Sequence, residues 1–384
     1  MNILIIHNYY STRGGEESVV EFQKQLLESK GHHVFLYTRH YNEMNNWLLG
    51  KSWGTFTSIF NRKSRKDLNK IICDFQPEVA ILHNLFPIIS PSIIPYLSKR
   101  GIRVFQVVHN YRMFCPIGIL YNKDQICHKC LNVGRELNCT INKCNDSFLQ
   151  SLSYSIRSYF VRKLNFYKNV DRFIVLSQFQ KSLFIENGFR EEKIEIIPNA
   201  YTPKCKIDFS DINLEEKLNI GFVGRLTQEK GFFDFVELAR QTPEYNFCVA
   251  GDYSHLPKTF EKPTNLTFDG LLNAEKLYDF YKKCRVILFL SHWYEGFPMV
   301  ILESMQNYTP LIVTNLGVMP EIIQHGKNGF VVSVGDLQSI RNHIVTLFSD
   351  TEIYQQMAIL GKQKCEEIYS VDNYYEKLMI AILN

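Results

Sequence analysis

The sequence predicts an α/β protein of two domains, each built on a parallel β-sheet covered by helices. Short, almost continuously apolar segments alternate with longer amphipathic segments along the whole chain, a pattern typical of parallel strands buried on both faces. The length of 384 residues is that of two domains of ordinary size. With 45% hydrophobic and 21% charged residues, the composition excludes a largely disordered or fibrous chain.

The first half contains five apolar segments that we predict as strands, with amphipathic segments between them. Ser18–Ser29 has apolar residues at near-helical spacing and is predicted as a helix. The predicted strands of this half are Ile3–Ile6, Val34–Tyr37, Val79–Leu82, Val104–Val108 and Phe173–Leu176. The first of them has no basic residue before it, so we expect a buried strand rather than a signal peptide.

The second half repeats the pattern. The predicted strands are Asn219–Val223, Tyr245–Ala250, Val286–Leu290, Leu311–Val313 and Gly329–Val332, and the predicted helices are Asp234–Arg240, Ala274–Cys284 and Met299–Asn307. Open parallel sheets bind ligands at the carboxyl ends of their strands. Candidate site residues are therefore sought in the loops that follow these segments.

A change of pattern near Pro198-Asn199-Ala200 marks the predicted domain boundary, because the polar segment that follows fits a linker. We predict domains at 1–198 and 199–367, facing each other across a cleft, a common place for ligands. A last helix, in 368–384, is expected to pack back on the first domain. Residues 115–145 form an insertion in that domain.

The net charge of +4 conceals an asymmetry between the halves. Residues 1–198 carry a net charge of +10 and the remainder −6. The asymmetry is either chance or a sign that the first half faces an anionic partner, such as lipid headgroups or a pyrophosphate-linked substrate. The chain has no zinc-finger spacing or aromatic RNA-binding motif, so we expect no nucleic-acid partner.

The first candidate site follows the strand Asn219–Val223, where Gly224-Arg225 is followed by Lys230-Gly231. Glycine permits a tight turn, while arginine and lysine are suited to phosphate oxygens. The amino terminus of the helix predicted next would add its dipole. The alternative is an ordinary basic loop, since the spacing is neither a Walker A nor a dinucleotide-binding motif.

The second candidate site follows the strand Val286–Leu290. There Glu295-Gly296-Phe297-Pro298-Met299-Val300 leads into a helix that carries Glu303. A carboxylate at the carboxyl end of a strand could accept hydrogen bonds from sugar or ribose hydroxyls. The alternative for a single Glu is a favourable interaction with a helix dipole.

These segments together resemble glycosyltransferase family 4, a group of retaining enzymes with the GT-B architecture of two Rossmann-like domains. Glu295 and Glu303 stand eight positions apart, as in the family's Glu-x7-Glu motif. Other segments resemble family signatures in the same order along the chain. These segments are Ile3–Gly15 with Arg13-Gly14-Gly15-Glu16, Val108-His109-Asn110, Pro198-Asn199-Ala200, Gly224-Arg225 through Lys230-Gly231, Pro320-Glu321-Ile322 and Asn328-Gly329.

The resemblance implies a role for each candidate residue. Arg225 and Lys230 would hold the donor diphosphate, and Glu303 would bind the ribose hydroxyls. Glu295 and His109 would contact the donor sugar as the catalytic residues. Without the resemblance, His109 would be interpreted as a buried core histidine. Gly14 and Gly15 would let the first loop approach the diphosphate. Gly296 and the backbone amides of Phe297, Pro298, Met299 and Val300 would help to hold sugar and phosphate.

The reaction implied is hexosyl transfer with retention from a nucleotide-diphosphate sugar to a glycan or polyprenyl-diphosphate-linked acceptor. Such an enzyme would serve bacterial capsule, O-antigen (lipopolysaccharide) or exopolysaccharide biosynthesis. The chain lacks the metal-holding Asp-x-Asp motif, so we expect catalysis without a metal cofactor. The alternatives are a GT-B-type sugar-nucleotide epimerase and a non-catalytic sugar-nucleotide-binding protein.

Five of the ten cysteines gather in the insertion. Cys127, Cys130, Cys139 and Cys144 have a spacing that could form a structural zinc site, although it is looser than a double Cys-x-x-Cys. The alternative is a reduced loop with free thiols.

Two basic and aromatic segments, Lys51–Lys66 and Phe148–Lys168, could contact an anionic membrane surface, or could be ordinary amphipathic helices. No apolar run approaches the roughly 18 residues of a membrane span. We therefore expect a cytoplasmic protein with possible peripheral contact with the inner face of the cell membrane.

Overall fold

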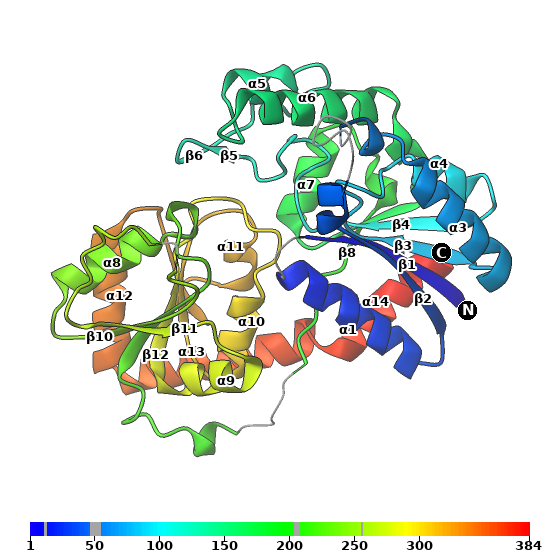
Figure 1. The fold of residues 1–384 in the computed structure, drawn as a ribbon. Helices are drawn as coiled ribbons and strands as arrows, with labels where there is room; N and C mark the ends of the chain where they lie inside the picture. Colours follow the sequence, from blue (N-terminus) through cyan, green and yellow to red (C-terminus); the bar gives the residue numbers. More distant parts are fainter. Residues whose placement is uncertain (11–13, 47–54, 203–207, 255) are drawn as a thin grey trace. The chain divides into compact units, whose positions relative to one another are not determined.

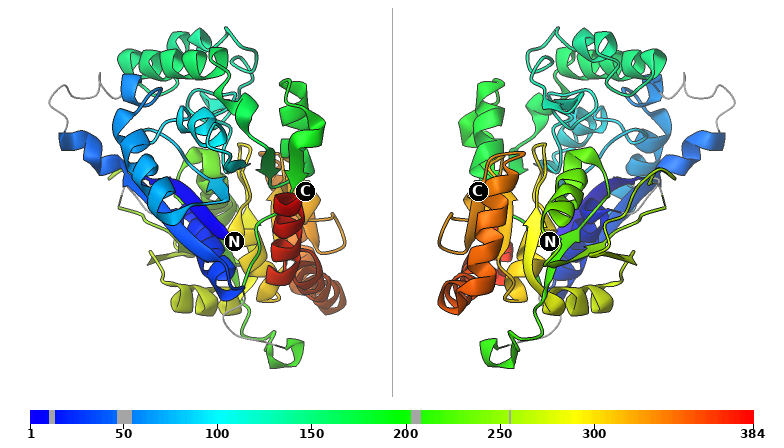
Figure 2. Two further views of the ribbon diagram at one scale, coloured as in Figure 1. Left: turned by 90° about the vertical axis from the view of Figure 1, so that its right-hand side faces the viewer. Right: turned by 90° about the vertical axis from the view of Figure 1, so that its left-hand side faces the viewer.

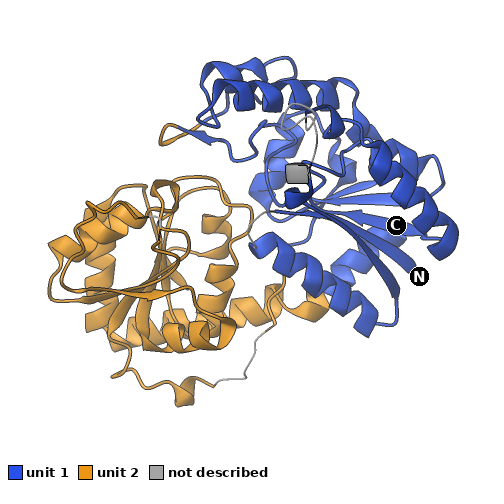
Figure 3. Ribbon diagram, viewed as in Figure 1, with its two compact units in different colours: residues 1–122, 127–199, 374–384 blue, residues 123–126, 200–373 orange. Residues whose placement is uncertain are grey.

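The computed structural model describes residues 1–10, 14–46, 55–202, 208–254 and 256–384. They form two compact units (Figure 3). Unit 1 comprises residues 1–122, 127–199 and 374–384, and unit 2 comprises residues 123–126 and 200–373. Each main body has its own parallel sheet. Two segments named above, Arg13 and the 51–54 part of the first basic stretch, lie outside the described residues.

Unit 1 is built on a six-stranded sheet in the order β2-β1-β3-β4-β7-β8, and every neighbouring pair is parallel (Figure 1). Its strands are β1 (Asn2–Tyr9), β2 (His33–His40), β3 (Val79–Leu82), β4 (Arg103–Val107), β7 (Arg172–Val175) and β8 (Ile194–Ile196). The inner strand β1 pairs Ile3 with Val34 on one side and Val79 on the other. Buried apolar side chains on β1, β3 and β4 form the centre of this core.

Helices and short 3-10 turns connect the strands of unit 1. They are α1 (Gly15–Ser29), η1 (Tyr41–Asn46), α3 (Arg62–Phe75), α4 (Ile93–Ser98), α5 (Leu137–Ile141), α6 (Phe148–Lys163), η2 (Phe166–Asn169), α7 (Gln178–Glu186), η3 (Glu191–Lys193) and α14 (Val371–Leu383). The last of these packs on α1: the Gln23 side-chain amide donates to Tyr374 Oη at 2.6 Å, and Phe22 lies against the same ring.

The insertion in unit 1 is a small layer of its own. It begins with the two-stranded sheet of β5 (Tyr121–Asn122) and β6 (Gln125–Ile126), of which β6 belongs to the short segment grouped with unit 2. Helix α5 follows and lies side by side with α6 in all views (Figures 1 and 2). A buried ion pair between Arg162 and Glu136, 3.0 Å apart, joins α6 to the residue that precedes α5. The second basic segment of the sequence is thus a helix with buried partners in unit 1.

Unit 2 has a second six-stranded parallel sheet in the order β11-β10-β9-β12-β13-β14. Its strands are β9 (Asn219–Val223), β10 (Asn246–Ala250), β11 (Leu266–Gly270), β12 (Cys284–Phe289), β13 (Leu311–Thr314) and β14 (Gly329–Val332). Its helices and 3-10 turns are η4 (Phe209–Asp211), η5 (Gln228–Lys230), α8 (Phe232–Gln241), α9 (Ala274–Lys283), α10 (Met299–Gln306), α11 (Met319–Ile322), α12 (Leu337–Ser349) and α13 (Thr351–Ile368). Two apolar clusters form its core.

Ten of the twelve strands in the two large sheets correspond to predicted segments, and β8 and β11 do not. Both are edge strands, and edge strands are covered incompletely. In β11, Leu266 is buried while Thr267 and Asp269 are exposed, so no continuous apolar run marks it. No helix of the described residues is long and apolar enough to cross a membrane.

Candidate functional site

The loops that follow β9 and β12 lie together in unit 2, because these two strands are neighbours in the sheet. The first loop carries Arg225 and Lys230, and the second carries Glu295. The His292 amide donates to the Glu229 carbonyl at 2.9 Å, which links the two loops. His292 Nε2 also lies 2.7 Å from Asp234 Oδ2 on α8. The sequence-predicted residues of both candidate sites therefore meet at one sheet edge.

Gly231 fixes the close approach of these loops. Its φ of +73° lies in the left-handed region, and a Cβ at this position would lie 2.0 Å from the Leu290 carbonyl oxygen at the end of β12. Only glycine fits such a backbone contact without strain. The loop can therefore lie against β12 and hold Lys230, the preceding residue, next to the second loop.

Glu295 is the centre of the site. Its Oε1 accepts hydrogen bonds from Lys230 Nζ at 2.7 Å, from Ser291 Oγ at 2.5 Å and from Trp293 Nε1 at 2.7 Å. The Glu295 side chain is 10% exposed and that of Lys230 18%. Burial would raise the pKa of Glu295, but the Lys230 ammonium and these donors outweigh it and hold the pKa below its ordinary value. The carboxylate is therefore ionised at neutral pH.

Arg225 lies more openly at the same edge. Its side chain is 62% exposed and its guanidinium is 3.4 Å from Glu229. Arg225 and Lys230 both approach the Trp293 ring, at 5.4 and 5.2 Å from its centroid. A flat ring thus lies beside two cations, one exposed and one fixed by a carboxylate. The Lys230 ammonium has three hydrogen-bond donors, and Glu295 takes one of them.

Helix α10 begins at Met299 and carries Glu303 in its second turn. Glu303 is half-buried and its Oε2 accepts a hydrogen bond from Tyr281 Oη at 2.8 Å. Burial, followed by the Glu303 charge, raises the pKa of Tyr281 well above its ordinary value, so its hydroxyl stays protonated as the donor. The two glutamates of the motif therefore lie on either side of the start of one helix, and each accepts hydrogen bonds from a separate set of donors.

The segment Gly296–Val300 lies at the amino terminus of α10, where its amide groups precede or open the helix. Pro298 is the N-cap residue and has no amide hydrogen. The prediction that the backbone amides of all four residues Phe297–Val300 donate is therefore wrong for Pro298. The amides that can donate are those of Phe297, Met299 and Val300.

His109 lies in unit 1, after β4, in a row of histidines. Its Nε2 is 2.7 Å from His83 Nδ1, and the two rings stack 5.0 Å apart. His83 Nε2 is in turn 2.9 Å from Gln23 Oε1, and His7 lies edge-on to His83. Burial, followed by the charge of neighbouring histidines, lowers the pKa of all three histidines, to about 4 for His7 and about 3 for His109.

This row fixes the tautomers of two rings. Gln23 donates its amide to Tyr374 and presents Oε1 to His83, so His83 Nε2 carries the hydrogen. A neutral His83 then accepts at Nδ1, and His109 must donate from Nε2. His109 therefore keeps a lone pair on Nδ1 and is a hydrogen-bond acceptor there.

The first loop of unit 1 ends at Gly14, the N-cap residue of α1. The Gly14 amide donates to Glu17 Oε2 at 2.7 Å. At Gly15 no described residue lies within 4 Å of a Cβ built on the backbone, and neither glycine has a positive φ. Packing among the described residues does not itself require glycine at position 15. Glu16, next along the chain, has a pKa raised to about 8, mainly by burial.

The four cysteines proposed as zinc ligands lie in the insertion. Cys130 and Cys139 are buried and Cys127 and Cys144 are half-buried. Burial and three neighbouring cysteines raise the pKa of the Cys130 thiol to about 12, and a hydrogen bond with Cys144, followed by burial, raises that of Cys139. Among the described residues, no three His, Cys, Asp or Glu side chains are arranged to hold a metal ion. Zinc binding stays a prediction.

Several contacts could not be found from sequence spacing. Tyr281 and His83 reach Glu303 and His109 from other elements, so no local motif marks them. Ser291 and Trp293 instead stand close in sequence, four and two residues before Glu295. Both side chains can donate a hydrogen bond, and this property, so close to Glu295, is the sequence signal that could have identified them.

Two family models match the chain and divide it between them. The model described as Glycosyltransferase Family 4 matches residues 12–204, about half of the chain, and the model described as Glycosyl transferases group 1 matches residues 206–364. A Klebsiella pneumoniae protein, "Uncharacterized 42.6 kDa protein in cps region", is 25% identical over 88% of this chain and 92% of its own length.

Two further similarities are informative. The Staphylococcus aureus capsular polysaccharide biosynthesis glycosyltransferase CapM is 22% identical over 57% of this chain and 63% of its own length. Among solved structures, Anabaena HepE in complex with UDP-glucose has a TM-score of 0.66 and 16% identity, and the alignment covers 100% of this chain and 99% of that one. The structural likeness establishes the GT-B fold.

Proposed function

Because the chain belongs to glycosyltransferase family 4, we propose that it transfers a hexose from a nucleotide-diphosphate donor to a glycan or lipid-linked acceptor during synthesis of a bacterial surface polysaccharide. The cps-region and capsular relatives support this class of pathway. The UDP-glucose in the HepE structure supports a nucleotide sugar as the donor.

The observation that carries the proposal is the Lys230–Glu295 pair at the carboxyl edge of the unit 2 sheet. A nucleoside diphosphate leaving group gains negative charge as it departs, and a fixed ammonium stabilises that charge most strongly in the transition state. Lys230 would meet the diphosphate together with Arg225. Glu295 would keep Lys230 in place and contact hydroxyls of the transferred sugar. Glu303, oriented by Tyr281, would bind the ribose.

We propose transfer with retention by attack on the face that the leaving group departs from. The bond between the sugar's anomeric carbon and the diphosphate oxygen breaks, and the electron pair stays on the diphosphate. The acceptor hydroxyl oxygen bonds to the same carbon, and its proton passes to a diphosphate oxygen. His109, with its lone pair on Nδ1, would accept a hydrogen bond from a donor-sugar hydroxyl.

This mechanism requires no divalent metal, because Arg225 and Lys230 supply the positive charge that a metal would otherwise supply. The corresponding expectation is turnover that persists when EDTA is added. Loss of turnover with EDTA, restored by Mg²⁺ or Mn²⁺, would contradict metal-independent transfer.

The experiment is a panel of nucleotide-diphosphate sugars, scored by nucleotide release with and without a glycan or polyprenyl-diphosphate-linked acceptor. A transferase releases nucleotide faster when acceptor is present, and NMR of the product's anomeric proton reports retention. An epimerase would release nucleotide and a modified sugar without acceptor. A protein that binds donors but never releases nucleotide would contradict the proposal.

The zinc site is a separate proposal. Cys127, Cys130, Cys139 and Cys144 would have to lose their thiol protons to bind zinc, which the raised pKa values of Cys130 and Cys139 oppose in the absence of metal. Metal content of protein purified without chelators would decide it. About one zinc per chain, lost in the Cys130→Ser variant, is the expected result, and metal-free folded protein would refute it.

A further inference from the structure

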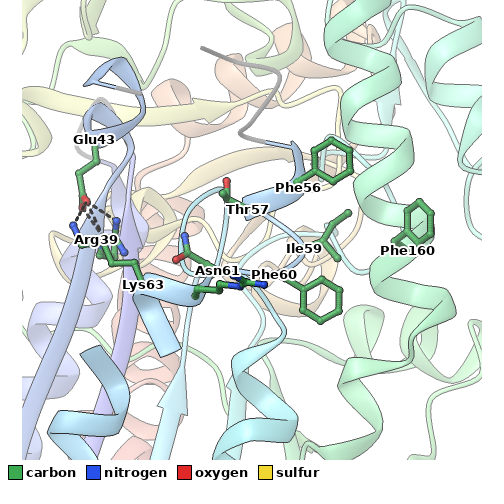
Figure 4. A pocket seen from close by; sticks show the side chains of 10 residues that line it. Arg39, Glu43, Phe56, Thr57, Ile59, Phe60, Asn61, Lys63 and Phe160 are labelled. Carbon is green, nitrogen blue, oxygen red and sulfur yellow. Dashed lines mark hydrogen bonds and ion pairs between the residues drawn. The ribbon is translucent and has the colours of Figure 1, made fainter. Parts of the chain in front are cut away.

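A cavity of about 950 Å³ lies in unit 1, between the carboxyl end of β2, the segment before α3, and α6 (Figure 4). This volume is at the upper end of the range for small-molecule sites, about 300–1,000 Å³. None of the residues placed in the candidate site above lines it. The cavity therefore has room for a ligand of its own.

One wall of the cavity is aromatic. Phe56, Phe60 and Phe160 lie on the same side in Figure 4, with Ile59 between them. The three rings are 66%, 52% and 44% exposed, whereas Ile59 is buried. Three large apolar side chains left accessible in one recess are a surface that an apolar chain would cover favourably.

The other wall is basic. Arg39 and Lys63 lie there together, both beside Glu43 (Figure 4). Arg39 is buried and is held by Glu43 at 2.6 Å and by Ser64 at 3.2 Å. Lys63 is 69% exposed and lies 3.9 Å from the same carboxylate. With Arg62, the lining of the cavity contains three cations and one anion.

Helix α3 begins at this basic wall. Asn61 caps it by accepting from the Ser64 amide at 2.9 Å, and its first turn contains no acidic residue. Basic residues instead occupy its first two positions, Arg62 and Lys63. Positive side chains at a helix amino terminus oppose the helix dipole, and an anion bound there would offset both. The charge arrangement thus favours an anionic group next to the aromatic wall.

The position in the sheet indicates which anionic amphiphile. Arg39 is the penultimate residue of β2, at the same carboxyl edge of the unit 1 sheet that carries His109 after β4. Ligands of open parallel sheets bind at that edge. Contact with a bulk membrane lipid would require only an outer surface of the protein. An acceptor must instead reach the carboxyl edge of the sheet, where the transfer would take place.

We propose that this cavity binds the lipid carrier of the acceptor, an isoprenoid phosphate or diphosphate. Its apolar chain lies against Phe56, Phe60 and Phe160, and its phosphate lies near Lys63 and Arg62. This inference rests on the proposed function, because it names the acceptor class of the same enzyme. It assigns the cavity to a substrate rather than to the general membrane surface.

The test measures binding of farnesyl phosphate to the full chain by equilibrium dialysis, without any donor. We compare Phe160→Ala with Phe148→Ala, because both residues are exposed phenylalanines on α6 and only Phe160 lines the cavity. Loss of one aromatic contact should weaken binding about tenfold in Phe160→Ala. Phe148→Ala should bind as the wild type does, and the melting temperatures of both verify folding.

A second pair tests the basic wall. Lys63→Ala should weaken farnesyl phosphate binding about three- to tenfold and reduce its salt dependence, whereas Lys66→Ala, on the same helix but outside the cavity, should not. Inorganic phosphate and farnesol, as partial ligands, should each bind more weakly than farnesyl phosphate. Equal binding by all four variants and the wild type would overturn the proposal.

Two further results separate the possible failures. If phosphatidylglycerol vesicles bind and farnesyl phosphate does not, the face is a membrane contact and the carrier site is refuted. Nucleotide release from the donor panel is measured independently with a soluble glycan acceptor. A protein that releases nucleotide but fails to bind farnesyl phosphate refutes only this inference. A protein that binds farnesyl phosphate but never turns over a donor refutes the proposed function and leaves the lipid site standing.

Discussion

The two units hold their candidate residues at the same place, the carboxyl edge of a six-stranded parallel sheet, but with opposite electrostatics. In unit 2 the central contact is an ion pair, with Lys230 Nζ 2.7 Å from Glu295 Oε1. In unit 1 it is a row of neutral imidazoles, in which His83 lies 2.7 Å from His109. One edge is organised by charge and the other by hydrogen bonds between uncharged rings.

The comparison shows that net charge does not predict the charge of a site. Residues 1–198 carry a net charge of +10, yet burial keeps the histidine row of unit 1 uncharged. Residues 199–384 carry −6, yet their sheet edge presents Arg225 and Lys230. Local position relative to a strand end decides which groups a ligand meets, while overall charge acts at longer range and is screened by salt.

The largest expected effect is in the charged edge. Lys230→Ala should lower kcat/KM for nucleotide release by roughly 100- to 1,000-fold, because one preorganised cation at a developing charge contributes that much. The measurement is steady-state nucleotide release with the best donor. Lys262→Ala, an exposed lysine of unit 2 outside the site, is the matched control. A Lys230→Ala protein within twofold of wild type would remove Lys230 from the mechanism.

The second effect tests how unit 2 places that cation. Gly231→Ala should destabilise unit 2 by about 3 kcal/mol, because a Cβ would meet the Leu290 carbonyl 2.0 Å away at a positive φ. Gly15→Ala in unit 1 is the counterpart, where a Cβ meets no described residue within 4 Å. It should change stability by less than about 1 kcal/mol. Urea unfolding of both variants checks the pair, and equal destabilisation would contradict it.

The third effect is the pH dependence of the two units. The folded pKa of His7 is about 4 against 6.5 unfolded, so the unfolded state binds more protons as the pH falls through this window. Each histidine with such a lowered pKa should reduce the free energy of unfolding of unit 1 by up to about 1.4 kcal/mol per pH unit below pH 6.5. Glu295, with a lowered pKa, should cost unit 2 stability only below about pH 4.5.

Hydrogen exchange followed by mass spectrometry resolves the two units in one experiment. Between pH 7 and pH 5, after correction for intrinsic exchange, protection of unit 1 peptides should fall more than that of unit 2 peptides, where burial lowers the pKa of the less buried His343. His7→Phe should flatten the slope for unit 1, because it removes one titrating ring. A parallel decline of both units would show that the histidines do not set the difference.

The smallest expected effect is in the neutral edge. His83→Phe removes the acceptor for His109 Nε2 and frees that ring to change tautomer. We expect kcat to fall about fivefold with the donor KM within about twofold, since loss of one neutral hydrogen bond corresponds to about 1 kcal/mol. His83→Gln, which keeps an acceptor oxygen, should recover part of the loss. A change in donor KM alone would instead indicate a structural role.

Much of the fold could be predicted from the sequence, because parallel strands buried on both faces are continuous apolar runs. Ile3–Ile6 and Val286–Leu290 are such runs, and they correspond to inner strands of their sheets, β1 and β12. The edge strands β8 and β11 were not predicted, since their exposed sides carry polar residues such as Glu195 and Asp269.

The sequence alone determined which residues have charge and where they stand relative to strand ends, so Arg225, Lys230, Glu295 and Glu303 could be named from local spacing. Tertiary structure alone decided their partners. Tyr281 meets Glu303 from α9, and the row from Tyr374 through Gln23 and His83 to His109 joins four separate segments. Spacing along a chain reports only neighbours within a strand, turn or helix, whereas burial and hydrogen bonding, which set each group's protonation, depend on atoms brought together by folding.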